Sequence, residues 1–233
     1  MILLLACATE AVDTAAEATG PLLDGVTYAV SWDDAGTTPT DAGWSTTNDL
    51  GWTFEVTSGW VVDRAWQLDP CSDDAGLALA WPLFLTPALA GHGEDDDVSV
   101  LTAPVATDLL AAASATLDAV AFDATAYCTL HVLNAYATTD TTGLPGDPDL
   151  VGYSLWLEGT ATLGDTTVAL SWASASADGA LYELPAEGEG TLGVLVTRSL
   201  AGLFDGVDPT GDDPARQLLQ NLVDQQQVEL TVL

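Results

Sequence analysis

The chain has 233 residues, of which 35 are acidic and three are cationic, so its formal net charge at pH 7 is −32. Such a surface repels nucleic acid and anionic membranes, which excludes direct binding of the protein surface to either. Hydrophobic residues nevertheless make up 48% of the sequence. Disordered acidic segments are poor in such residues, so we expect a folded protein with an acidic surface. Adaptation to a saline habitat can produce an acidic surface without any binding role.

The N-terminal segment has the features of an export signal. Its residues 4–7, "LLAC", resemble the lipobox of bacterial envelope lipoproteins, which is cut before the cysteine. The resemblance implies that residues 1–6 are the end of a signal peptide and that Cys7 carries a diacylglyceryl anchor. Under the sorting rule of this class, Ala8 after the cysteine implies transfer to the outer membrane.

The resemblance also has consequences for the flanking residues. The apolar run before Cys7 is shorter than the usual signal-peptide core of about 7 to 15 residues, so we expect translation to begin upstream of Met1. Residues 7–22 are small and acidic, without strong periodicity. We expect them to form a tether between the lipid anchor and the folded part of the chain.

From residue 23 onward, apolar and polar residues alternate with period two, which is typical of half-buried strands. Gly164-Asp165 lies between two such runs and predicts a hairpin with a type II′ turn. Residues 105–113 fit either a helix or a strand. Strands are predicted over residues 26–32, 52–57, 60–68, 153–163, 166–172, 192–196 and 228–232.

One cation falls on the apolar side of a predicted strand. In the run 60–68, the alternation places Arg64 with the apolar residues and Asp63 on the opposite face. We expect Arg64 to form a buried or edge ion pair, with its aliphatic stem packed on the apolar face. A binding site for an anion is the alternative interpretation.

A helical insert is predicted near the C-terminus. Asp213 is a favourable N-cap residue, and Pro214 suits the first helical position. A second, shorter helix is expected over residues 199–204. The apolar stripe of the first helix consists of Leu218, Leu219, Leu222 and Val223. Together these patterns predict an all-β protein, an antiparallel β-sandwich with a short helical insert, formed by a single domain over residues 23–233.

The chain has three cysteines. Cys128 lies in a predicted strand in which His131 points to the opposite face, which argues against a metal site that uses both. Because the lipobox resemblance assigns Cys7 to the lipid, Cys71 and Cys128 remain. We expect these two to form a disulfide in an oxidising compartment.

An acidic loop offers possible metal ligands. The segment "GHGEDDDVSV" combines an imidazole with consecutive carboxylates, which suit calcium or copper. A solvated acidic loop is the alternative interpretation, because consecutive acids do not have the spacing of an EF-hand loop. Two further segments, 146–152 and 205–213, combine aspartate with turn residues and carry a weaker signal of the same kind. The candidate ligands in the first segment are His92, Glu94, Asp95, Asp96 and Asp97.

No catalytic motif is present in the sequence: it has no nucleophile elbow, phosphate loop, dinucleotide fingerprint or zinc-protease helix. We therefore expect an exported, lipid-anchored, non-enzymatic binding or structural protein of the bacterial cell envelope. The alternatives are a periplasmic protein that binds a divalent cation through the His92 loop and an envelope hydrolase that uses two carboxylates. The predicted partner is the membrane, through the lipid anchor; a protein or glycan partner is not identified. Trp156 lies on a polar strand face, where its ring could stack on a sugar.

Overall fold

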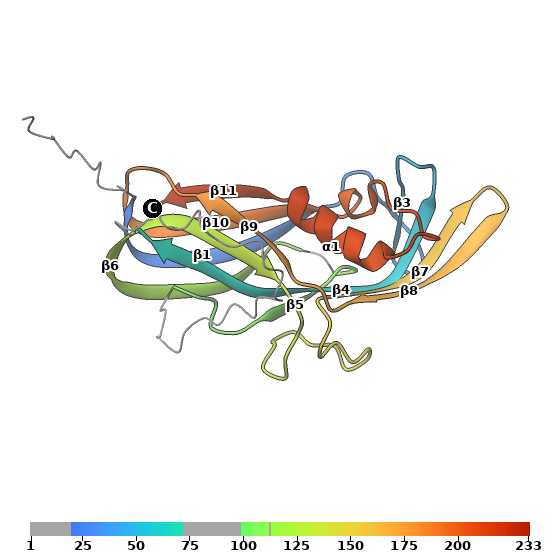
Figure 1. The fold of residues 1–233 in the computed structure, drawn as a ribbon, viewed down its shortest axis with the longest axis horizontal. Coiled ribbons are helices and arrows are strands. Elements are labelled where there is room, and N and C mark those ends of the chain that lie inside the picture. Colours follow the sequence, from blue (N-terminus) through green and yellow to red (C-terminus); the bar gives the residue numbers. More distant parts are fainter. Residues whose placement is uncertain (1–19, 72–98, 112) are drawn as a thin grey trace, which may run out of the picture.

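A computed structural model describes residues 20–71, 99–111 and 113–233 (Figure 1). Strands dominate, and one short α-helix, α1, lies near the C-terminus, so the all-β prediction with a short helical insert is confirmed. The strands are β1 (Leu22–Asp33), β2 (Thr38–Pro39), β3 (Trp44–Thr47), β4 (Thr53–Pro70), β5 (Val105–Asp108), β6 (Ala115–Asn134), β7 (Leu155–Leu163), β8 (Thr166–Ser174), β9 (Asp178–Glu183), β10 (Glu189–Ser199) and β11 (Gln227–Val232). The helices are η2 (Gly202–Phe204) and α1 (Pro214–Asp224).

The strands of these described residues all belong to one sheet, whose main path has the order β11-β10-β1-β6-β4-β3-β2. Four strands branch from this path: β5 and β7 pair with β4, β8 pairs with β7, and β9 pairs with β6. The β1–β10 pair is parallel, which corrects the prediction of an antiparallel sheet. Side chains alternate with period two in parallel and antiparallel strands alike, so the sequence pattern cannot show whether two paired strands run in the same direction.

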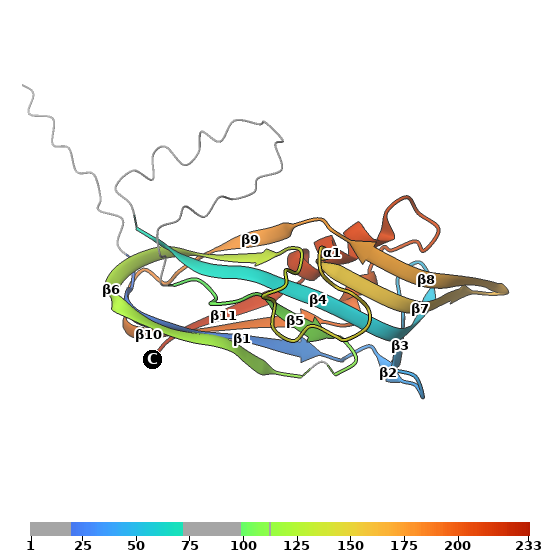
Figure 2. The same ribbon diagram turned by 90° about the horizontal axis from the view of Figure 1, so that it is seen from below.

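The sheet curls because β6 changes partners along its length (Figure 2). Residues 115–126 of β6 pair with β1, and residues 127–134 pair with β4. Between Leu23 and Gly25 the β6 partners jump from Thr125 to Ala121, so three residues of β6 oppose one residue of β1. A bulge of this kind bends the strand that carries the extra residues. The two halves of the sheet are therefore continuous, and the prediction of a β-sandwich is not confirmed.

Apolar side chains fill the space between the two halves of the curled sheet. The residues that alternate along β1, including Val26, Tyr28 and Val30, are buried there. They pack with Trp66 of β4 and Leu130 of β6, and the rings of Tyr28 and Trp66 meet edge to face. The period-two pattern of the sequence thus identifies the residues of this core.

A second core lies beneath α1. The predicted stripe of Leu218, Leu219, Leu222 and Val223 is buried. It packs together with η2 and the inner faces of β4 and β7. Phe204 of η2 stacks on Phe54 of β4, with ring centroids 4.4 Å apart. The short helix predicted over 199–204 is confined to η2, because Ser199 still belongs to β10.

Other local predictions have mixed outcomes. The β7–β8 hairpin and its two-residue turn are confirmed, with Gly164 at φ 57°. The strands predicted over 52–57 and 60–68 form one strand, β4, whose pairing with β7 shifts between Val56 and Ser58. The ambiguous segment 105–113 contains the strand β5. The short strands β2, β3 and β9, and the part of β6 that precedes Tyr127, were not predicted.

The predicted N-cap residue of α1, Asp213, can be tested by substitution. The Asp213 carboxylate accepts a hydrogen bond from the backbone N–H of Arg216 at 3.1 Å. Asp213→Ala is expected to lower the free energy of unfolding by about 1 kcal/mol, because the amide loses its partner. Urea unfolding followed by circular dichroism measures the change. Asp212→Ala removes the same charge from a neighbouring exposed residue and should have a smaller effect; equal effects would contradict the capping role.

Candidate functional site

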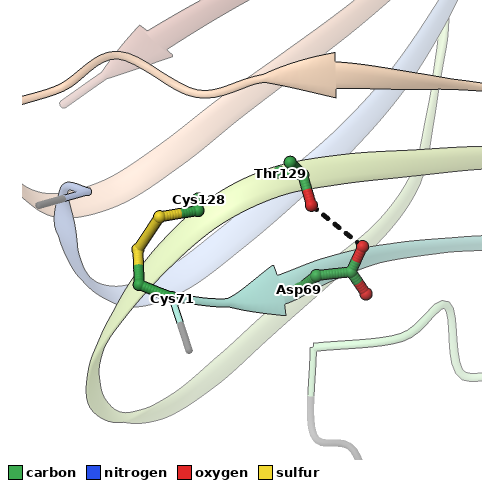
Figure 3. Close-up of a disulfide and its surroundings, with 4 residues drawn as sticks. All are labelled: Asp69, Cys71, Cys128 and Thr129. Carbon is green, nitrogen blue, oxygen red and sulfur yellow. Dashed lines mark hydrogen bonds between the residues drawn. A yellow bond between two sulfur atoms is a disulfide. The ribbon is translucent and has the colours of Figure 1, made fainter. Parts of the chain in front are cut away.

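The predicted disulfide between Cys71 and Cys128 is present (Figure 3). It joins the residue after β4 to the part of β6 that follows the bend, with the two Cα atoms 4.9 Å apart. Beside it, the Thr129 hydroxyl donates to the Asp69 carboxylate at 3.0 Å. Since the Cys128 sulfur is bonded to Cys71, it cannot act as a thiolate ligand together with His131.

The other predicted site residues lie outside the described part of the chain. These residues are the lipidation site Cys7 and the candidate metal ligands His92, Glu94, Asp95, Asp96 and Asp97. His131 is described: it lies on β6 between Gln67 of β4 and Leu181 of β9. Of the two histidines, only His131 therefore lies in the described part of the chain.

The most notable charged group of the described structure is buried between β4 and β10. Arg198 is 1% exposed, and its partner Asp63 is 0% exposed. The guanidinium binds the carboxylate with both terminal nitrogens, at 2.7 Å from Nη2 to Oδ1 and 3.1 Å from Nη1 to Oδ2. This two-point geometry is the strongest form of a side-chain ion pair.

Neighbouring side chains satisfy the rest of this ion pair. The indole N–H of Trp66 and the amide of Asn134 each donate to Oδ1 of Asp63 at 3.1 Å. The Asn134 carbonyl oxygen accepts from Arg198 Nη2 at 3.2 Å. The guanidinium carbon also lies 5.7 Å from the ring centroid of Trp32 and 5.8 Å from that of Trp66. Hydrogen bonds and aromatic faces therefore replace the water that both charges lose on folding.

The network continues to the edge strands. Arg198 Nε donates to the side-chain oxygen of Gln226 at 3.4 Å. The Gln226 amide in turn donates to the Tyr182 hydroxyl at 2.8 Å. Because Tyr182 lies on β9 and Gln226 directly precedes β11, the network connects both halves of the curled sheet to the C-terminal strand. We assign it a role in fixing the fold, because its charged pair, Arg198 and Asp63, is closed to solvent.

The sequence placed these charges incorrectly. Asp63 was predicted on the polar face and Arg64 on the apolar face, whereas Asp63 is fully buried and Arg64 is half-buried. The cause is a register shift of β4 against β6 between Asp63 and Ala65. In the described residues, Arg64 forms no ion pair: it donates to the Thr138 hydroxyl at 3.2 Å and lies 5.2 Å from the ring centroid of Tyr136. The predicted ion pair belongs to Arg198 instead.

A signal for the buried arginine was present in the sequence. Leu192, Val194 and Val196 alternate on the inner face of β10, and Arg198 occupies the next inward position of the same strand. Extending the alternation by one step would have predicted a buried cation that needs a carboxylate partner. The sequence contains no comparable signal for the identity of that partner.

The ionisation of Tyr182 tests the network. Burial raises the pKa of Tyr182 above its ordinary value of 10.0, and the Gln226 hydrogen bond and the Arg198 charge only partly oppose this. The folded state therefore favours the neutral phenol. Its contribution to stability is complete below the unfolded-state pKa and is lost as the pH rises through the folded-state pKa.

We expect Tyr182→Phe to make the loss of stability above about pH 10 less steep, because the pKa of this phenol lies above 10.0 in the folded state. Urea midpoints measured across this range check the expectation. Tyr153→Phe removes one phenol from a site that is 36% exposed and serves as the control. An unchanged pH dependence in Tyr182→Phe would show that this phenol does not contribute.

The weaker acidic segments have turn-forming roles. In 205–213, Asp208 accepts hydrogen bonds from the N–H and hydroxyl of Thr210, at 2.9 and 2.7 Å, and these bonds hold the pKa of Asp208 below its ordinary value. In 146–152, Asp149 accepts from the N–H of Val151 at 3.1 Å. Among the described residues, no group of three or more histidine, cysteine or acidic side chains is placed to hold a metal ion.

Three surface depressions bear on the two-carboxylate hypothesis. One of about 550 Å³ lies at the bend of β6 and has Asp123 in its lining. A second of about 420 Å³ contains Asp108. A third of about 410 Å³ lies on the outer face of β1, β10 and β11 and contains Glu229. Each lining has a single acidic residue, whereas the hydrolytic mechanism needs two that face each other.

Comparisons with known proteins add no relative. The chain matches no protein-family model, and no curated protein or solved structure is significantly similar to it. Among the helices that the structure describes, none has the length and apolar character needed to cross a membrane. A functional proposal therefore depends on the residues and contacts described above.

Proposed function

We propose that this chain is an exported protein of the bacterial cell envelope, anchored by a lipid on Cys7, and that its β-rich part acts as a non-enzymatic binding or structural module. The observation that carries the proposal is the Cys71–Cys128 disulfide. Disulfides persist in oxidising compartments such as the periplasm and the cell surface, and they are rare in the cytosol. The "LLAC" segment supports the same location, and Ala8 favours the outer membrane.

Cysteine use agrees with this proposal. Cys71 and Cys128 are bonded to each other, so Cys7 is the remaining cysteine of the chain. A lipid on Cys7 would consume that thiol, whereas an odd cysteine in an exported protein otherwise forms an intermolecular bond or remains reactive. The same anchor would hold a protein of net charge −32 at a membrane surface that its own charge does not favour.

Mass spectrometry of the protein extracted from membranes tests the anchor. We expect an N-terminal peptide that begins at Cys7 and carries the mass of a diacylglyceryl group. Cys7→Ser should abolish both the added mass and the membrane association. The matched control, Cys71→Ser with Cys128→Ser, should keep both. Unprocessed residues 1–6 without an acyl chain would contradict the proposal.

The metal-binding alternative depends on His92 and the four acids that follow it. Titration of the full chain with calcium or copper in high salt separates a specific site from the general attraction of cations to an acidic surface. A saturable site that His92→Ala weakens would support this alternative. The hydrolase alternative needs two facing carboxylates, and none of the three depressions supplies them.

A further inference from the structure

β8 forms an open border of the sheet. Among the described residues it pairs with β7 alone, in a continuous register from Leu155–Ser174 to Leu163–Thr166. In Figure 2 the β7–β8 hairpin projects from the end of the molecule opposite the bend of β6, and β8 is its outer strand. The strand is nine residues long, which is enough to form a full set of pairing hydrogen bonds with another strand.

The direction of the unpaired groups follows from the turn. Because two residues connect the strands, Leu163 and Thr166 form the hydrogen-bonded pair that closes the hairpin. Every second residue after Thr166 also faces β7, and the residues between them direct their N–H and C=O groups outward. These residues are Thr167, Ala169, Ser171 and Ala173; their side chains are exposed, and among the described residues none has a backbone hydrogen bond outside the sheet.

The composition of β8 does not protect this edge. Natural edge strands usually carry a lysine, a proline or a bulge, which prevents pairing with another chain. The sequence of β8, "TTVALSWAS", has neither a charged residue nor a proline, and its pairing with β7 has no bulge. In a chain with 35 acidic residues, this strand is an edge at which a second strand would meet no charged side chain of β8 itself.

We propose that β8 pairs with β8 of a second copy of this chain, antiparallel about a two-fold axis at Leu170. In this register Thr167 lies opposite Ala173 of the second copy, and Ala169 lies opposite Ser171. Every outward-facing backbone group then has a partner on the other chain. The two-fold symmetry makes each contact away from the axis occur twice, as in other interfaces formed by identical surfaces.

The inner face of β8 supports this register. There Val168 lies opposite Trp172 of the second copy, and Leu170 lies opposite its own counterpart. Val168 and Trp172 pack only partly against the core beneath α1, so their remaining apolar surface is available to the second strand. A β-branched residue opposite an aromatic one is a favourable cross-strand pair. All facing side chains of the proposed interface are thus uncharged.

Charge argues for a second copy rather than a basic peptide. The net charge would attract a basic partner, but β8 itself offers no carboxylate to receive its cations. Two copies avoid that mismatch, although their net charges of −32 repel each other at long range. The dimer should therefore strengthen with salt, because about 1 M NaCl reduces the screening length to about 3 Å.

Two double variants at the same positions test the pairing. Ala169→Asp with Ser171→Asp places acids opposite acids and should weaken the dimer at least about tenfold. Ala169→Lys with Ser171→Asp places each introduced lysine opposite an introduced aspartate and should retain the dimer. Sedimentation equilibrium of the full chain in about 1 M NaCl measures both. Cys7→Ser in every sample prevents association through a lipid or a free thiol.

Hydrogen exchange locates the interface. The outward amides of Thr167, Ala169, Ser171 and Ala173 should exchange more slowly at concentrations where the chain is dimeric, while the amides that face β7 are protected at all concentrations. A chain that stays monomeric, or a dimer that the two-aspartate variant does not weaken, would overturn the proposal. Protection of these amides only when a different protein is added would assign the edge to that partner and would also overturn it.

Discussion

Asp63→Asn is expected to lower the free energy of unfolding by about 3 to 5 kcal/mol, because it leaves the Arg198 guanidinium charged in a dry environment without its carboxylate. The asparagine has nearly the same size, so packing changes little. Its amide can accept one of the two arginine hydrogen bonds, but it carries no charge to balance the cation. Urea unfolding at constant salt concentration measures the loss. Urea is uncharged, so it does not screen the ion pair as the denaturant guanidinium chloride would.

Arg64→Met is the matched control for the loss of an arginine from the same region. Arg64 is half-buried and donates to a neutral hydroxyl, so we expect a loss of about 1 kcal/mol or less. Arg198→Met should resemble Asp63→Asn, because it leaves the Asp63 carboxylate buried without its cation. If Asp63→Asn were no more destabilising than Arg64→Met, the ion pair would not have the structural role assigned here.

The double variant separates the pair from its surroundings. Asp63→Asn combined with Arg198→Met removes both charges, so no uncompensated charge stays buried. Its cost should therefore be clearly smaller than the sum of the two single costs. Additive losses would mean that each side chain stabilises the fold through separate contacts, such as those of Arg198 with Gln226 or Asp63 with Trp66.

Local signals in the sequence were sufficient for the hairpin and the helix. The Gly164-Asp165 turn lies between two alternating strands, and the N-cap, proline and apolar stripe of α1 lie within a few residues of one another. Such elements are determined by neighbouring residues, and both are confirmed. The parallel β1–β10 pair joins segments far apart in the chain, and alternation does not record the partner or the direction of a strand.

The same distinction applies to the candidate site residues. The disulfide was predictable because the lipobox resemblance sets Cys7 aside, which leaves only Cys71 and Cys128 to pair. The ion pair was not, because Asp63 and Arg198 are 135 residues apart and a single shift of register brings Asp63 to the inner face. With 35 acidic residues in the chain, composition alone could not select the one that pairs with the buried arginine.

Removal of the disulfide by Cys71→Ser with Cys128→Ser is expected to lower the free energy of unfolding by about 4 kcal/mol. The bond closes a loop with a sequence separation of 57 residues, and in the chain-entropy model it restricts the unfolded chain accordingly. Replacing both cysteines avoids a free thiol that could pair with Cys7. Urea midpoints with and without a reducing agent provide the measurement.

The response to a reducing agent relates the stability of the protein to the redox state of its compartment. The parent chain and Cys7→Ser should both lose stability on reduction, whereas the variant without Cys71 and Cys128 should be insensitive to it. Domains are commonly stable by only about 5 to 15 kcal/mol, so a loss of about 4 kcal/mol would increase the unfolded fraction close to a thousandfold. A protein with this dependence keeps its full stability only where the disulfide persists, which is the physical basis of the proposal that it functions outside the cytoplasm. If reduction left the unfolding midpoint of the parent chain unchanged, the disulfide would no longer support that location.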